Sequence, residues 1–306
     1  MNKRIITAAI TGSIHTPSMS DYLPITPDQI VDETVRAYEA GASVAHIHAR
    51  NPENGQPSSD ISIYREIAAK VKSRCDIILC ITTGGGLGMS ADERVAAIPE
   101  LKPELASLNF GSLNFALFAA LDTYKQFKFP WEKDYLAMTE DFILPNTFKT
   151  MARFGEVFRE NMTKPELEIY DVGMLNNAAF MIEKGHIGKP IYVQFVLGIL
   201  GGIPATPDNL MFMYNTAKSS IGDFVWSVCA AGRHQFNMCV MSLVLGGNAR
   251  VGLEDNLYLE KGVKAKSNAL QVEKIVRIAR ELGLEPATPN EARQILGLKG
   301  LDKVAY

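Results

Sequence analysis

Short apolar runs recur along the chain, and each is followed by a turn or polar loop and then by a stretch whose apolar positions have helical spacing. This alternation is typical of βα units around a parallel sheet. Eight such runs fit a closed (β/α)8 TIM barrel, of class α/β, better than an open sheet. The predicted strands are Ile5–Ile10, Ser43–Ile47, Ile77–Ile81, Leu105–Leu108, Leu167–Tyr170, Ile191–Phe195, Phe224–Cys229 and Ala249–Val251.

Three predicted helices begin with a capping box, in which a polar residue is followed three positions later by Gln or Glu and the pair satisfies otherwise unpaired amides. After the first box, Val31, Val35 and Tyr38 share one helical face, and Gly41 ends the helix before the second strand. One complete βα repeat is therefore visible. The boxes are Thr26-Pro-Asp-Gln29, Ser90-Ala-Asp-Glu93 and Thr288-Pro-Asn-Glu291.

The stretch from about residue 116 to 165 has no clear strand, carries Trp131 and is too long for a single connection. We expect it to contain the fourth helix and an excursion over the barrel mouth or onto a neighbouring subunit. No linker or short-period repeat interrupts the chain. Residues 1–306 are therefore expected to form one domain, a length that barrels reach.

Composition narrows the functional classes. The chain is 47% hydrophobic and 21% charged, which is typical of a protein with a large buried core. A net charge of −3 gives no general attraction to nucleic acid or to an anionic membrane, so an anionic substrate must be held by local positive charge. No apolar run approaches the roughly 20 residues that span a bilayer. The four cysteines lack C-x-x-C spacing, and we expect reduced thiols in a soluble cytoplasmic protein.

The clearest candidate for chemistry is His46-Ile-His48, at the carboxyl end of the second predicted strand. A spacing of two places both imidazoles on one face of the strand, and barrel active sites lie at the carboxyl ends of strands. Imidazole is a favoured zinc ligand, and Glu254 after the eighth strand is a candidate third ligand. Arg250 and Asp255 then lie beside the metal. The alternatives are one packed and one solvated histidine, and a surface ion pair between Arg250 and Asp255.

Other strand ends are also polar. The glycine-rich segment Thr82–Gly86 lets backbone amides approach an anion, and it matches neither a Walker loop nor a G-x-G-x-x-G fingerprint. Ser107 and Asn109 follow the fourth strand, and Glu168 and Asp171 belong to the fifth. Each of these polar residues, taken singly, more often has a structural role. The prediction of a site rests on their shared position at the carboxyl ends of the strands. One further polar loop, after the seventh strand where barrels often bind phosphate, is Gly232-Arg233-His234-Gln235.

Only five histidines are present, which excludes the amidohydrolase barrels because those need further histidines at the fifth and sixth strand ends. His186 precedes the sixth strand, on the face that serves stability, and we expect a surface role. His15 follows the first strand and is expected to contact substrate or to cap the loop, without binding the metal.

Six segments together resemble the β-keto acid cleavage enzymes, a family that includes the 3-keto-5-aminohexanoate cleavage enzyme of lysine fermentation. The resemblance extends from the first strand to the last helix, and the order of its H-x-H and R-V-G-x-E-D elements is specific. The segments are Thr7–Gly12, Ala45–Arg50, Thr82–Gly86, Ser107–Ser112, Arg250–Asn256 and Ala287–Ala292.

The resemblance implies a zinc-dependent homo-oligomeric barrel, a tetramer, that converts a β-keto acid and acetyl-CoA into acetoacetate and a new acyl-CoA. By similarity, His46, His48 and Glu254 bind the metal, and Arg250 with Asp255 removes a proton from the carbon between the two carbonyls. Arginine is almost always protonated, so Asp255 must share that role.

The same resemblance assigns the remaining site residues. Glu168 completes the polar wall. Members that act on the cationic amino substrate have a carboxylate where this chain has Ile14, so we expect a neutral or anionic keto acid to be preferred. Thr82 replaces a frequent serine and keeps the hydroxyl. The residues expected to hold the substrate carboxylate are Thr82 with Gly84 and Gly85, Ser107 and Asn109.

Two other functions stay open from the residues alone. A metal-dependent aldolase or lyase acts through an enolate without acetyl-CoA, but its H-x-H lies near the seventh strand, where this chain has Gly232-Arg-His-Gln. A non-catalytic ligand-binding barrel predicts low metal content and no turnover. The contacts of coenzyme A cannot be assigned from spacing.

Overall fold

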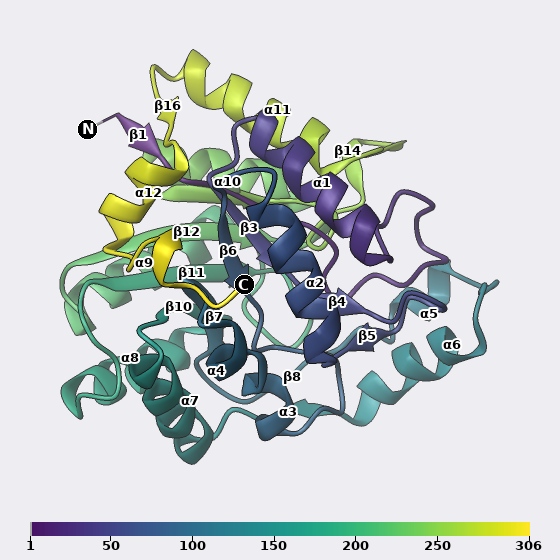
Figure 1. The fold of residues 1–306 in the computed structure, drawn as a ribbon, viewed down its shortest axis with the longest axis horizontal. Helices are drawn as coiled ribbons and strands as arrows, with labels where there is room; N and C mark the ends of the chain where they lie inside the picture. The colour runs from purple at the N-terminus through teal and green to yellow at the C-terminus, as the bar shows by residue number, and fades with distance from the viewer. Residues whose placement is uncertain (1) are drawn as a thin grey trace.

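A computed structural model describes residues 2–306 (Figure 1). Eight parallel strands form a closed barrel in the order β2-β3-β6-β7-β10-β11-β12-β13, with β13 pairing back to β2. The predicted α/β barrel and all eight of its strands are confirmed, with ends displaced by up to three residues. The strands are β2 Ile6–Ala9, β3 Val44–Ile47, β6 Ile78–Ile81, β7 Leu105–Asn109, β10 Lys164–Ile169, β11 Ile191–Leu197, β12 Phe224–Ala230 and β13 Asn248–Val251.

Helices cover the outside of the barrel because alternate strand residues point outward and are apolar, as Ala45 and Ile47 of β3 are. The three predicted capping boxes are present at Thr26, Ser90 and Thr288. The covering helices are α1 Pro27–Glu39, α2 Ile61–Lys72, α3 Ala91–Val95, α4 Ala97–Leu101, α7 Phe148–Glu160, α8 Val172–Glu183, α9 Pro207–Ser220, α10 Gln235–Val244 and α11 Asn268–Glu281.

The amino end of the barrel is filled and closed. Inward-facing Ile5, Val44, Ile78 and Leu105 form one buried cluster with side chains of α12 Pro289–Leu296, which packs beneath them beside the start of the chain (Figure 1). Two short strands, β1 Lys3–Arg4 and β16 Glu285–Pro286, tie this end together. The carboxyl end of the barrel is therefore the end that is open for a site.

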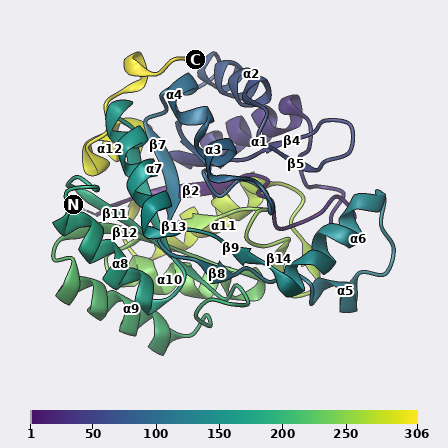
Figure 2. The same cartoon turned by 90° about the horizontal axis from the view of Figure 1, so that it is seen from below.

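The long connection contains α5 Ala120–Thr123, α6 Pro130–Ala137, the 3-10 helix η1 Met138–Asp141 and β9 Ile143–Leu144 before the fourth barrel helix, α7. The expectation that it holds no strand is wrong, because β9 pairs with β8 Leu113–Asn114 and β10 begins at Lys164. Figure 2 shows α5 and α6 to one side of the barrel. There the Tyr135 hydroxyl donates to Ser13 O at 3.0 Å, which ties α6 to the loop after β2.

The other short elements lie in loops: β4 Ala49–Arg50 with β5 Pro57–Ser58, β14 Tyr258–Glu260 with β15 Val263–Lys264, and the 3-10 helices η2 Gly232–His234 and η3 Leu301–Lys303. All four cysteine thiols are free, and Cys75 alone is partly exposed. Within residues 2–306, none of the helices has the length and apolar character needed to cross a membrane.

Candidate active site

A cavity opens at the carboxyl ends of the barrel strands, and every strand or the loop after it contributes to its wall. It contains eleven of the twelve residues that the sequence analysis assigned to a site. The lining residues are Ser13, Ile14, His46, His48, Thr82, Gly84, Gly85, Leu87, Asn109, Phe115, Leu144, Glu168, Tyr170, Val196, Ile199, Cys229, Ala231, Arg250, Glu254 and Asp255.

His46, His48 and Glu254 converge at the base of this cavity. Glu254 Oε1 lies 3.5 Å from Nε2 of His46 and 3.5 Å from Nε2 of His48, and all three side chains are buried. These separations are long for hydrogen bonds. They suit tetrahedral ligands of one ion, because nitrogen and oxygen ligands about 2.1 Å from zinc stand about 3.4 Å apart. The second carboxylate oxygen, Glu254 Oε2, is buried without a partner. The three residues therefore fit a divalent metal.

Glu254 reaches this position because residue 12 is glycine. Gly12 has a φ of +60°, and a Cβ there would lie 2.3 Å from Cγ of Glu254. The Glu254 backbone is fixed from the same side, since its N–H donates to Ala9 O at 3.1 Å. The turn after β2 thus leaves the space that the third candidate ligand occupies.

A second group of possible ligands, His46 with Cys80 and Glu166, lies deeper in the barrel. Cys80 and Glu166 do not line the cavity. Burial raises the pKa of the Cys80 thiol well above its ordinary value and that of the Glu166 carboxyl to about 7. A neutral thiol in a closed layer is a poor ligand, so the set with Glu254 is the better candidate.

The Arg250 guanidinium is surrounded by three buried carboxylates. It forms a bidentate pair with Asp255, with Nε to Oδ2 and Nη2 to Oδ1 both at 3.0 Å. Nη2 also donates to Glu254 Oε1 at 2.8 Å, and Nη1 donates to Glu168 Oε1 at 3.2 Å. The predicted alternative of an Arg250–Asp255 pair on the surface is wrong, because both side chains are buried.

The protonation states of these groups differ. Burial raises the pKa of Asp255 to about 6 and that of Glu168 to about 8, against the lowering effect of Arg250. Burial opposes ionisation of Glu254 too, but the positive charges of a protonated His46 and of the Arg250 guanidinium outweigh it and hold the pKa of that carboxyl well below its ordinary value. Burial lowers the pKa of His46 well below its ordinary value, which favours the neutral imidazole that binds metals.

Polar groups on the opposite wall are available to a bound anion. Thr82 Oγ1 accepts the Gly84 N–H at 3.0 Å, which leaves the hydroxyl hydrogen free to donate. Asn109 is buried, and its Oδ1 has no partner. Arg94 fixes this loop, donating to Thr83 O at 2.7 Å and to Asn146 Oδ1 at 2.6 Å. Thr82 and Asn109 thus each keep an unused hydrogen-bonding group.

Ser107 is the predicted site residue that the structure does not place at the cavity. Its side chain points into the barrel one layer below Asn109, because residues two apart on a strand share a face, and its Oγ faces the Thr83 N–H at 3.4 Å. His15 caps the loop before Glu254, since its Nδ1 donates to Leu253 O at 2.8 Å. Asp171 is the N-cap of α8. His186 lies near the amino ends of the strands, as expected.

The sequence analysis missed the apolar side of the cavity. Phe115, Leu144, Tyr170, Val196 and Ile199 line it. Apolar residues in such positions have the sequence signal of ordinary core, and Leu144 comes from the connection that carried no predicted strand. A small molecule in this cavity therefore meets charge at one end and a hydrocarbon wall at the other.

Fold and site define a barrel enzyme with a candidate metal centre beside a buried ion-pair network. A profile of the beta-keto acid cleavage enzyme family matches residues 3–298, and the chain belongs to this family. It is therefore an enzyme that cleaves a carbon–carbon bond, and the predicted family membership is confirmed.

Similar proteins cover nearly the whole chain. It is 44% identical over 299 residues to the 3,5-dioxohexanoate:acetyl-CoA acetone transferase of Paraburkholderia graminis, covering 97% of this chain and 96% of that protein. It is 40% identical over 299 residues to the 3-keto-5-aminohexanoate cleavage enzyme of Acetoanaerobium sticklandii, covering 97% and 99%. The apo structure of ObcA shares the fold, with a TM-score of 0.66 and 23% identity over 91% of this chain and 66% of that one.

Proposed function

We propose that the protein is a zinc-dependent acyltransferase that converts a β-keto acid, R–CO–CH2–COO⁻, and acetyl-CoA into acetoacetate and R–CO–CoA. The acetyl group leaves the coenzyme A sulfur and joins the CH2 carbon, and the R–CO group leaves that carbon and joins the sulfur. The proposal rests on one observation, the convergence of His46, His48 and Glu254 beside the Arg250–Asp255 pair. The names of the relatives, which contain β-keto acids and acetyl-CoA, agree with it.

His46, His48 and Glu254 are the residues that hold the metal in this proposal. A bound zinc ion supplies Lewis-acid polarisation of the keto oxygen, which lowers the barrier to proton loss from the neighbouring carbon.

Asp255 is the group that accepts the proton from that carbon. It lines the cavity, and the Arg250 guanidinium pairs with both of its oxygens and stays protonated throughout. Arg250 positions the carboxylate and balances its charge. Glu168, whose pKa burial raises to about 8, completes the polar wall as a neutral acid and donates to a substrate oxygen.

The carboxylate of the keto acid is held on the opposite wall. Thr82 donates its hydroxyl hydrogen, Asn109 donates from its side-chain amide, and the backbone at Gly84 and Gly85 comes close to the anion. This arrangement directs the R group toward the rest of the cavity, whose lining includes Ile14.

Ile14 determines which R groups are accepted. Its hydrocarbon side chain cannot pair with an ammonium group, so 3-keto-5-aminohexanoate is a poor substrate and a neutral or anionic keto acid is preferred. The 3,5-dioxohexanoate in the name of the Paraburkholderia graminis relative is uncharged beyond its carboxylate, in agreement with this preference.

A substrate panel tests the proposed function. The zinc-loaded protein is incubated with straight-chain, dioxo, dicarboxylic and amino β-keto acids, with and without acetyl-CoA, and acetoacetate and the new acyl-CoA are quantified. We expect turnover only with acetyl-CoA, and more slowly with the amino compound than with the others. Cleavage without a thioester identifies a lyase, and ligand binding without turnover identifies a non-catalytic barrel.

A further inference from the structure

Two more hollows adjoin the metal-site cavity and lead outward from it. The middle hollow shares Ile14 with the metal-site cavity, and it shares Asn256 and Tyr258 with the outer hollow. The middle hollow is mainly apolar, and its other lining residues include Met19, Leu117, Leu136 and Leu257. The shared lining residues define a path of three neighbouring hollows from the candidate metal site toward the surface.

Two chain segments run along this path. Ala231 lines the metal-site cavity, Gly232 the middle hollow and Arg233 the outer hollow. In the same way, Glu254 and Asp255 line the first and Leu257 the second, and Lys261 lines the third. Successive Cα atoms are about 3.8 Å apart, so the three spaces follow one another closely. These segments follow the seventh and eighth barrel strands, where barrels often bind phosphate.

The outer hollow is basic and has an aromatic wall. Arg233, Lys261 and Lys274 line it together with a single acidic residue, Glu260. Among residues 2–306, none of these three cations forms an ion pair with a carboxylate. Arg233 Nε donates to His234 Nε2, and Lys274 Nζ donates to Leu259 O. Lys274 Nζ lies 4.2 Å from the centroid of the Phe236 ring. Cations that no carboxylate neutralises, beside an aromatic ring, suit a phosphorylated nucleotide.

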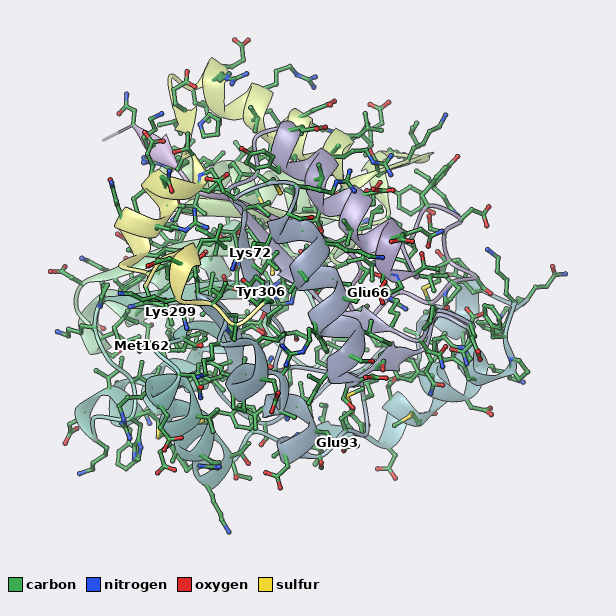
Figure 3. All side chains as sticks on the ribbon, viewed as in Figure 1. Glu66, Lys72, Glu93, Met162, Lys299 and Tyr306 are labelled. Atoms are coloured by element: carbon green, nitrogen blue, oxygen red, sulfur yellow. The ribbon has the colours of Figure 1, made fainter. Side chains whose placement is uncertain are left out.

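A second basic pocket is too far from the metal-site cavity to bind the phosphorylated end of a thioester that reacts there. It is lined by Arg159, Lys164, Lys189 and Lys299, and Figure 3 labels Lys299 and Met162 of this pocket. Lys164 begins β10 and Lys189 precedes β11, so the pocket lies at the amino ends of the strands. The filled barrel separates it from the metal-site cavity. A thioester anchored there cannot reach His46 and His48.

We propose that coenzyme A binds along the path from the outer hollow to the metal-site cavity. Its phosphorylated adenosine end contacts Arg233, Lys261 and Lys274, the pantetheine arm passes through the apolar middle hollow, and the thioester enters beside Ile14. This assignment rests on the proposed function, because only an acetyl-CoA-dependent reaction requires such a site.

The test compares two thioesters in Arg233→Ala, Lys261→Ala and the double variant. Loss of each charge raises KM for acetyl-CoA roughly fivefold, and the double variant raises it about 25-fold, because separated contacts add. The kcat/KM for S-acetylpantetheine, which lacks the nucleotide, stays at the wild-type value. Lys189→Ala, in the second basic pocket, is the matched control and leaves both values unchanged.

Calorimetry with adenosine 3′,5′-bisphosphate supplies a readout that does not need turnover. We expect the wild type to bind it and the double variant to lose that binding. The proposed path is overturned if the wild type is active and the double variant keeps the wild-type KM for acetyl-CoA. It is also overturned if the double variant loses kcat/KM equally with acetyl-CoA and with S-acetylpantetheine. A wild type that is inactive with every β-keto acid refutes the proposed function instead, and absence of bisphosphate binding then overturns the path as well.

Discussion

The side chain of Glu254 occupies the space in which any residue other than glycine at position 12 would place its Cβ. We expect Gly12→Ala to displace the Glu254 carboxylate and to lower zinc affinity at least tenfold, because a proposed metal ligand must move. Zinc content after dialysis and kcat measure the effect. Gly185→Ala is the control, since Gly185 also has a positive φ, +75°, but has nothing within 4 Å of its added Cβ. Equal zinc loss in both variants contradicts the steric argument.

Metal binding and proton transfer are assigned to different residues. His46→Ala and His48→Ala should lose zinc and activity together, because each removes one of the three proposed ligands. Asp255→Asn should keep zinc and lose about a thousandfold or more in kcat, because the amide cannot accept the proton. Metal analysis beside steady-state kinetics separates the two outcomes. Similar zinc loss in all three variants would show that the roles are not separate.

Ile14 is predicted to control the charge of the accepted R group. Ile14→Glu should raise kcat/KM for 3-keto-5-aminohexanoate relative to a neutral keto acid by about tenfold, since a charge pair in a shielded site contributes about 1.4 kcal/mol. Ile14→Gln, of similar size without charge, is the control. A ratio that rises equally in both variants points to polarity or size as the cause.

Glu166 should make the stability of the metal-free protein depend on pH. Burial raises its pKa to about 7 from an ordinary value of 4.5. Between these two values the unfolded chain loses a proton that the native state keeps. The free energy of unfolding therefore falls as pH rises, and above pH 7 the contribution of Glu166 to it no longer changes. The total loss of unfolding free energy due to Glu166 across this pH range is about 3 kcal/mol.

Glu166→Gln removes this contribution, because the amide does not ionise. Urea unfolding of both proteins with a chelator present, at several pH values from 4.5 to 8, measures the difference. We expect the variant to gain stability relative to the wild type as pH rises. Parallel curves would show that Glu166 ionises normally in the native state.

Sequence patterns predicted most of the fold and the polar half of the site. The strands were visible because each is a short apolar run between polar loops, and the H-x-H spacing placed His46 and His48 on one face without any tertiary information. Ser107 was misplaced because a spacing of two from Asn109 gives the face of a side chain but does not give its depth in the barrel.

Two other features depend on contacts between distant segments. Leu144 reaches the cavity through the pairing of β9 with β8, which involves only two residues on each strand and leaves too short a pattern to recognise. The position of the Glu254 side chain beside both histidines depends on Gly12, which lies 242 positions away in the sequence. The contact between Gly12 and Glu254 arises only when the barrel closes and brings the first and eighth strands together.

The seal that α12 forms beneath the barrel has a kinetic consequence. A blind-ended chamber takes in and releases both reactants by the same route. In the proposed reaction the keto acid lies at the deep histidines, behind the thioester. We therefore expect the thioester to bind second and the new acyl-CoA to depart before acetoacetate. The closed floor thereby imposes an order of events that an open tube would not.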